Sequence, residues 1–180
     1  CIIKQIHSNK LVLTSKLIPQ KNFFADGLIG DEKNQNLWIY TADCMPILFA
    51  DKYQRRIAAV HCGRKGLEQN IIPNTIKSFE SMGSLRKDIL VSIGPSISGD
   101  KYLLDKKTYN EFFFALNRSF NKEKDYFTIP NNLEIHESIS LDIKKFAYLQ
   151  LLRENLDPNN IEISNKCTYS SPEEFHSWRR

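Results

Sequence analysis

The sequence predicts an α/β fold in which a mixed sheet is flanked by helices, in a single domain that spans residues 1–180. Segments rich in β-branched and aromatic residues recur along the chain, and segments with helical spacing of apolar residues follow or separate them. Strands and helices do not alternate strictly, so we expect a mixed sheet. The chain has 180 residues, 41% hydrophobic and 26% charged, which suits one globular core.

Strands are expected mostly in the first hundred residues, where apolar runs are short and bounded by polar residues. In chain order they are residues 1–7, 10–15, 36–44, 45–52, 55–63 and 88–97, with a last strand within 159–169. Residues 23–30 (FFADGLIG) end in small and acidic residues, so we expect a loop there.

Three helices are expected between and after these strands. Residues 70–83 begin with Asn70, which can cap a helix, and end with Gly83, which suits a C-terminal stop. Pro73 falls in the first turn, where proline is tolerated. Residues 106–120 and 140–156 carry apolar residues at helical spacing.

The charge pattern argues against nucleic acid and membranes as partners. The net charge is +4, but Lys and Arg are scattered, and runs such as Arg55-Arg56 are interrupted by other residues. A nucleic-acid interface needs a denser basic stripe with interleaved aromatics, so we interpret these charges as a solvated face. No apolar run approaches the roughly 18 to 20 residues of a membrane span. The sequence does not indicate an oligomeric state.

The cysteines favour a reducing compartment. Cys1, Cys44, Cys62 and Cys167 form no C-x-x-C pair and no dense framework, so we expect a cytoplasmic location. Cys62 follows His61 in an expected strand and should therefore point to the opposite face, as a buried residue. Because the chain begins with Cys1 and not with Met, we also expect an upstream segment.

Soft metal ligands stand at strand ends where further apolar residues would be ordinary. Cys44 ends the TADC run, His61 lies in AAVHCG, and His7 lies in KQIHSN. Zinc binds His nitrogen and Cys sulfur, and three protein ligands leave a fourth position open, as in catalytic sites. Copper accepts the same ligands. The spacing matches no short zinc motif, so a buried thiol and two hydrogen-bonded histidines also fit. His136 lacks such a setting, and we expect it at the surface.

A basic turn bracketed by glycines follows His61, with the sequence Gly63-Arg64-Lys65-Gly66. Glycines let the backbone approach a ligand closely, while backbone N–H groups and cations favour anions. The turn thus suits a phosphate beside the metal, although a tight turn with two solvated cations explains the same residues.

Five motifs, taken in order, resemble the YfiH-like laccase-domain family, known as multicopper polyphenol oxidoreductases and peptidoglycan-editing factors. They are KQIHSN (4–9), YTADCMPILFAD (40–51), AAVHCGRKG (58–66), GPSISGDKY (94–102) and CTYSSPEEFHSWRR (167–180). The resemblance implies a fold similar in core to the catalytic domain of cytotoxic necrotizing factor toxins. It also implies a zinc site made of His7, Cys44 and His61.

Three departures from the family pattern bear on the site. The family has Trp-Arg where this chain has Arg64-Lys65, so a flat aromatic wall is lost and the cation cannot clamp an oxyanion with two parallel hydrogen bonds. Ser8 replaces a glycine after the first histidine, and Ser96 replaces a common cysteine.

The resemblance implies a zinc-dependent enzyme of purine nucleosides, which catalyses phosphorolysis of adenosine, inosine and methylthioadenosine and deaminates adenosine. Cys44, Asp43 and His61 would be its catalytic residues, with Asp43 a proton carrier or an orienting residue, and Gly63 to Gly66 would bind the substrate phosphate. A strand-end hydrogen bond explains Asp43 equally well.

Other functions remain open at this point. Editing of a peptidoglycan precursor would use metal-activated water, or Cys44 activated by His61, to attack an amide or ester. Copper-dependent oxidation of phenols is disfavoured because it needs several coppers and more than the four histidines present. A non-catalytic member that binds zinc for structure is the remaining alternative.

Overall fold

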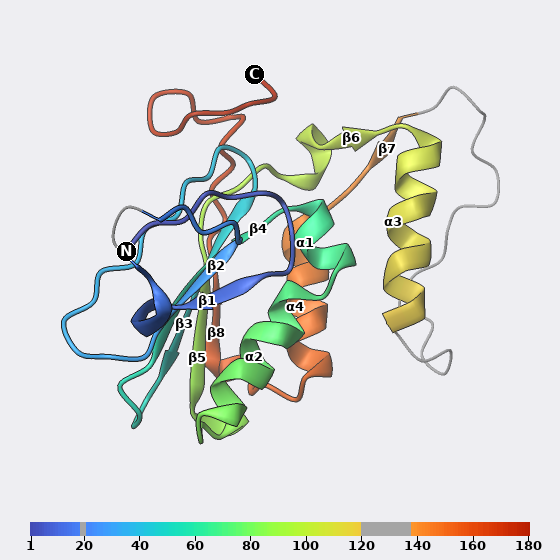
Figure 1. Cartoon of the computed structure of the whole chain (residues 1–180). Helices are drawn as coiled ribbons and strands as arrows, with labels where there is room; N and C mark the ends of the chain where they lie inside the picture. Colours follow the sequence, from blue (N-terminus) through green and yellow to red (C-terminus); the bar gives the residue numbers. More distant parts are fainter. Residues whose placement is uncertain (19–20, 120–137) are drawn as a thin grey trace.

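The structure is a computed structural model that describes residues 1–18, 21–119 and 138–180. Its centre is a six-stranded mixed sheet with the order β1-β2-β4-β3-β5-β8 (Figure 1). The strands are β1 (Leu11–Leu13), β2 (Gly27–Gly30), β3 (Met45–Asp51), β4 (Ile57–Cys62), β5 (Ile89–Ile93) and β8 (Ile161–Ile163). The pairs β1–β2 and β5–β8 are parallel, and the three central pairs are antiparallel. The predicted fold class is therefore confirmed.

Helices flank one face of this sheet, as Figure 1 shows for α1, α2 and α4. The helices are α1 (Arg64–Glu68), α2 (Ile71–Ser81), α3 (Lys106–Ser119) and α4 (Ile143–Arg153). Short 3-10 turns are η1 (Thr14–Lys16), η2 (Arg86–Asp88), η3 (Gly99–Lys101) and η4 (Pro158–Asn160), and β6 (Leu103–Leu104) pairs with β7 (Ile139–Ser140) as a separate ribbon. Among the described residues, no helix combines the length and apolarity needed to cross a membrane.

The two ends of α2 compare differently with the sequence signals, since Gly83 ends the helix as predicted and Asn70 precedes it without the predicted side-chain cap. Asn70 precedes the helix in a left-handed conformation (φ 61°), although its side chain makes no capping hydrogen bond. Gly83 adopts φ 93°, its N–H donates to the Glu80 carbonyl, and the N–H of Ser84 donates to the Phe79 carbonyl. These two bonds form the glycine-dependent Schellman stop that Gly83 predicts.

The core lies between the sheet and the helices. Met45, Ile47 and Phe49 alternate along β3 toward the helices, where Phe79 of α2 is fully buried. Phe79 and Phe49 pack with ring centroids 6.3 Å apart. On the opposite face, Leu48 of β3 is exposed and lines an open apolar groove of about 720 Å³.

Some expected elements are wrong or shorter than predicted. Residues 1–7 and 36–44 form no strand but only single bridges, such as Ile2 with Trp38, and left-handed residues close to their ends (His7, φ 57°; Asp43, φ 93°) turn the chain there. In the last expected strand, only Ile161–Ile163 is extended.

The expected loop at residues 23–30 contains β2, which is wholly buried. Its glycines suit a close approach of neighbouring strands, since a Cβ at Gly27 would collide with the Leu11 side chain. The expected helix at 140–156 begins later, at Ile143, because the Asp142 carboxylate caps it by accepting from the Lys145 N–H. The basic turn after His61 is itself a short helix, α1. Phe120 and His136 lie outside the described residues.

Candidate metal centre

Antiparallel pairing of β3 and β4 brings Cys44 and His61 together. Cys44 directly precedes β3, and Pro46 of β3 pairs with His61 near the end of β4. The next residue beyond β4 is Gly63, where a Cβ would lie 2.5 Å from the Cys44 sulfur. Glycine is therefore required at position 63 for the thiol to keep its place. Cys62 points to the other side of β4 and is fully buried, as predicted.

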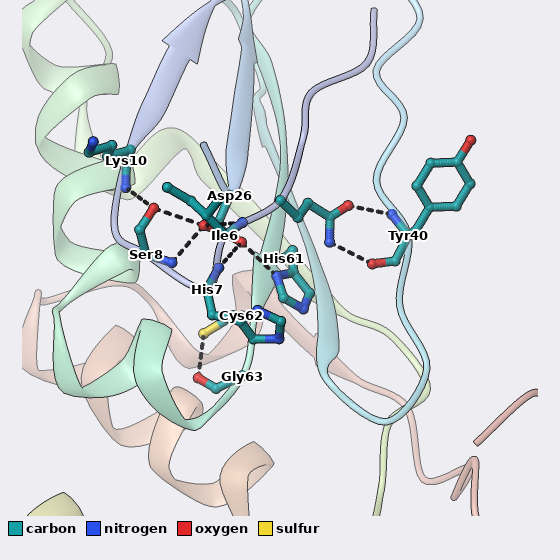
Figure 2. Close-up of polar contacts among 10 residues, drawn as sticks. Ile6, His7, Ser8, Lys10, Asp26, Tyr40, His61, Cys62 and Gly63 are labelled. Atoms are coloured by element: carbon teal, nitrogen blue, oxygen red, sulfur yellow. Dashed lines mark hydrogen bonds and ion pairs between the residues drawn. The ribbon is translucent and has the colours of Figure 1, made fainter. Parts of the chain in front are cut away.

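His7 reaches the same place from a turn and not from a strand. Its backbone is left-handed, and the N–H groups of Ile6, His7 and Ser8 all donate to the Asp26 carboxylate, at 3.3, 2.9 and 2.6 Å. The Ser8 hydroxyl adds a fourth bond, at 2.8 Å. Figure 2 shows this turn closing around Asp26. The carboxylate thus fixes the backbone that carries the first ligand.

The same carboxylate orients His61. Asp26 Oδ1 lies 2.9 Å from His61 Nδ1, and both residues are buried (Figure 2). Burial alone would raise the pKa of Asp26, but the hydrogen bonds from His61 and Ser8 outweigh burial and lower this pKa to about 2. An ionised carboxylate only accepts, so in the neutral ring the proton sits on Nδ1 and Nε2 is left as the candidate ligand atom.

The three candidate ligands form one cluster. Ligand atoms of His7, Cys44 and His61 lie within 4.8 Å of one another. The two imidazole rings meet edge to face, with centroids also 4.8 Å apart. Two nitrogens and one sulfur, with a carboxylate behind one histidine, are a donor set that fits zinc and leaves a fourth position for water or substrate. The residues present therefore fit the metal that the sequence predicts.

The histidines differ in their affinity for protons. Burial lowers the pKa of His61, but hydrogen bonds with Asp26 and Cys44 outweigh it and raise the pKa to about 9. The pKa of His7 is lowered by burial and then by His61, with a smaller contribution from Lys65. His7 is therefore a ready ligand near neutral pH, whereas His61 must lose a proton before it binds a metal.

The cluster opens into a cavity of about 710 Å³, a size typical of small-molecule sites. Arg64 and Lys65, the cations of α1, line it together with Gly63. Arg64 forms an ion pair with Glu68, whereas the Lys65 side chain is exposed. The predicted anion-binding residues are thus beside the candidate metal ligands, with the exception of Gly66, which is buried against Ile71.

A family model described as "Multi-copper polyphenol oxidoreductase laccase" matches residues 1–180. The chain belongs to this laccase family. A relative from Synechocystis sp. named purine nucleoside phosphorylase is 32% identical over 195 residues, which cover 99% of this chain and 74% of the relative. YlmD of Bacillus subtilis, also named a purine nucleoside phosphorylase, is 33% identical over 86% of this chain and about half (53%) of its own length.

Solved structures of the laccase family share the fold. YlmD from Geobacillus stearothermophilus matches 99% of this chain and 67% of its own with a TM-score of 0.85, at 24% identity. The YfiH protein of Bacillus licheniformis matches the same shares with a TM-score of 0.84, also at 24% identity.

Asp43 and Asp26 are two acids next to the candidate metal ligands, and they have different partners. Asp43 is buried, and its carboxylate accepts from the Thr168 hydroxyl at 2.7 Å, the Ser177 hydroxyl at 3.0 Å and the Arg179 N–H at 2.8 Å. Asp43 therefore holds the C-terminal segment, and the acid in contact with His61 is Asp26. Sequence reasoning missed Asp26, whose one signal is an acid inside the apolar run FFADGLIG.

Proposed function

We propose that the chain is a zinc-dependent purine nucleoside phosphorylase that also deaminates adenosine. The observation that carries this proposal is that one cavity contains both a set of ligand atoms suited to zinc and the cations of α1. The names of relatives that match 99% of the chain support the phosphorolysis.

Phosphorolysis joins a phosphate oxygen to C1′ of the ribose and breaks the bond from C1′ to the purine, which leaves with the electron pair and gains a proton. Lys65, with Arg64 and the backbone of Gly63, would bind phosphate and keep it close to the sugar. His7, Cys44 and His61 would hold zinc, which when bound supplies a Lewis acid to the cavity. Asp26 keeps His61 in the tautomer that binds metal.

Product analysis by liquid chromatography tests this proposal. The zinc-loaded chain is incubated with adenosine and phosphate, and with adenosine alone. Adenine and ribose 1-phosphate are expected with phosphate, and inosine without it. Cys44→Ala should remove all three products, whereas Cys1→Ala, which changes an exposed thiol outside the cavity, should keep them. Failure of the parent chain to convert adenosine under either condition refutes the proposal.

A second candidate is hydrolysis of an amide or ester in a cell-wall precursor. The succession Asp26–His61–Cys44 favours it, because an acid that orients a histidine beside a thiol is the arrangement of cysteine hydrolases. Zinc would quench such a nucleophile. Addition of a chelator should therefore increase hydrolysis of a peptidoglycan precursor, whereas it should abolish the nucleoside activity.

A further inference from the structure

Two aromatic side chains of the cavity are strongly exposed. Trp178 is 88% exposed and Tyr40 is 68% exposed, yet both line the cavity that contains His7, Cys44 and His61. Aromatic side chains of this size normally bury most of their surface. Two exposed aromatic rings beside the candidate metal ligands provide a surface suited to a planar ligand.

The backbone on either side of Trp178 is fixed by one buried carboxylate. The Ser177 hydroxyl and the Arg179 N–H, from the residues before and after Trp178, both donate to Asp43. Asp43 also binds the buried Thr168 hydroxyl. The Arg179 guanidinium lies 4.9 Å from the centre of the Tyr102 ring and donates to the Leu103 carbonyl. The position of Trp178 is thus held although its indole is bare.

Tyr40 is held in a similar way. Its N–H donates to Gln5 Oε1 at 2.7 Å, and its carbonyl accepts from Gln5 Nε2 at 2.8 Å. Figure 2 shows Tyr40 on the far side of His61 from the turn of His7 and Ser8. Gln5 lies two residues before His7, so one short segment supplies a candidate metal ligand and fixes the backbone that carries an aromatic ring.

Fixed backbones with bare rings lower the entropic cost of stacking a planar ligand, because less of the protein must become ordered on binding. The polar side of the cavity contains Lys65 and the candidate metal ligands. We therefore expect a ligand in which a planar aromatic group is bonded to a polar group. We propose that Trp178 and Tyr40 bind the purine base by stacking, and that Asp43 is the positioning residue that holds Trp178. This inference rests on the proposed function, since it takes a nucleoside as the ligand.

Steady-state kinetics and fluorescence test the inference together. Base stacking on an aromatic side chain corresponds to about a 10- to 100-fold effect. Trp178→Ala and Tyr40→Ala should therefore raise KM for adenosine by about that factor, with little change in kcat or in KM for phosphate, and Trp178→Phe should restore most of the affinity. Asp43→Asn should raise KM for adenosine with zinc affinity retained.

Matched controls are available on other surfaces. Trp38 is 64% exposed in the groove on the open sheet face, and Tyr53 is 77% exposed, so Trp38→Ala and Tyr53→Ala should leave KM unchanged. The chain has two tryptophans, so in a Trp38→Phe chain the emission comes from Trp178 alone and adenosine should quench it saturably.

The possible results separate this inference from the proposed function. Turnover of adenosine with KM unaffected by Trp178→Ala and Tyr40→Ala would overturn the stacking site and leave the function intact. Saturable quenching without turnover would support the base site and refute the reaction. Absence of both quenching and turnover would overturn both.

Discussion

Replacement of Asp26 by asparagine removes an acceptor on which two candidate metal ligands, His7 and His61, depend. Asp26 Oδ2 accepts from the Ile6 N–H and from both the N–H and the hydroxyl of Ser8. Asp26 Oδ1 accepts from the His7 N–H and from His61 Nδ1. An asparagine that keeps its oxygen toward Ser8 turns its NH2 toward His7 and His61. The His7 N–H then lacks an acceptor, which costs about 1–3 kcal/mol. Weaker bonds to Ser8 add to this cost, and easier burial of a neutral amide offsets part of it. We expect the free energy of unfolding of the metal-free chain to fall by about 2–4 kcal/mol.

The same substitution changes the tautomer of His61. An amide NH2 can only donate to Nδ1, so in the neutral ring the proton moves to Nε2, which can then no longer bind zinc. Loss of such a carboxylate partner reduces metal affinity by about 10- to 100-fold. Competition with a chromogenic chelator measures the affinity, and urea unfolding of the metal-free chain measures the stability.

Asp31→Asn is the matched control for Asp26→Asn. Asp31 likewise accepts hydrogen bonds from a hydroxyl and a backbone N–H, those of Thr14 and Ser15, but it does not line the cavity of the donor set. Zinc affinity should be unchanged in this variant. If Asp26→Asn also binds zinc within twofold of the parent chain, the reasoning on the His61 tautomer is refuted.

Three further predictions concern pH, packing and charge. The pKa of His61 is raised from 6.5 to about 9, so its protonated form stabilises the metal-free chain below pH 6.5. This stabilisation is lost as pH rises through about 9, and urea unfolding should show the resulting fall in the free energy of unfolding. Zinc affinity should increase over the same pH range, because the neutral ring binds the metal. Gly63→Ala should displace Cys44, weaken zinc binding and destabilise the chain by about 1–3 kcal/mol. Gly83→Ala, whose side chain is strained at φ 93°, should lower the free energy of unfolding but leave the zinc affinity unchanged. Lys65→Met should raise KM for phosphate and Lys65→Arg should not, as initial rates at varied phosphate would show.

Residues that act through local pattern were predictable from the sequence. The strands around Ile47 and Val60 are apolar runs of the right length, and Gly83 is a helix stop whose geometry depends on that residue alone. The prediction that Cys44 and His61 come together at adjacent strand ends needed only the antiparallel pairing of consecutive strands. That residues 1–180 form a single domain stays a prediction.

Residues that act through distant partners were not predictable. β2 contains two glycines, and it is a strand because it pairs with β1 and β4, whose Leu11 and Val60 occupy the space that a side chain at Gly27 would fill. Asp26 contacts a histidine 35 positions later, and a single sequence gives no sign of that pairing. The roles of Asp43 depend on Thr168 and residues beyond it, so local sequence could not separate proton transfer from positioning.

The hydrogen bonds of Asp43 have a consequence for synthesis on the ribosome. The partners of its carboxylate stand 125 to 136 positions further along the chain, whereas the three candidate metal ligands all lie before residue 62. A growing chain therefore contains its donor atoms long before the C-terminal segment that Asp43 holds. That segment cannot bind Asp43 until residue 179 has left the exit tunnel. Translation that stops shortly before residue 179 would produce a chain with all three candidate metal ligands but without the C-terminal segment that completes the cavity.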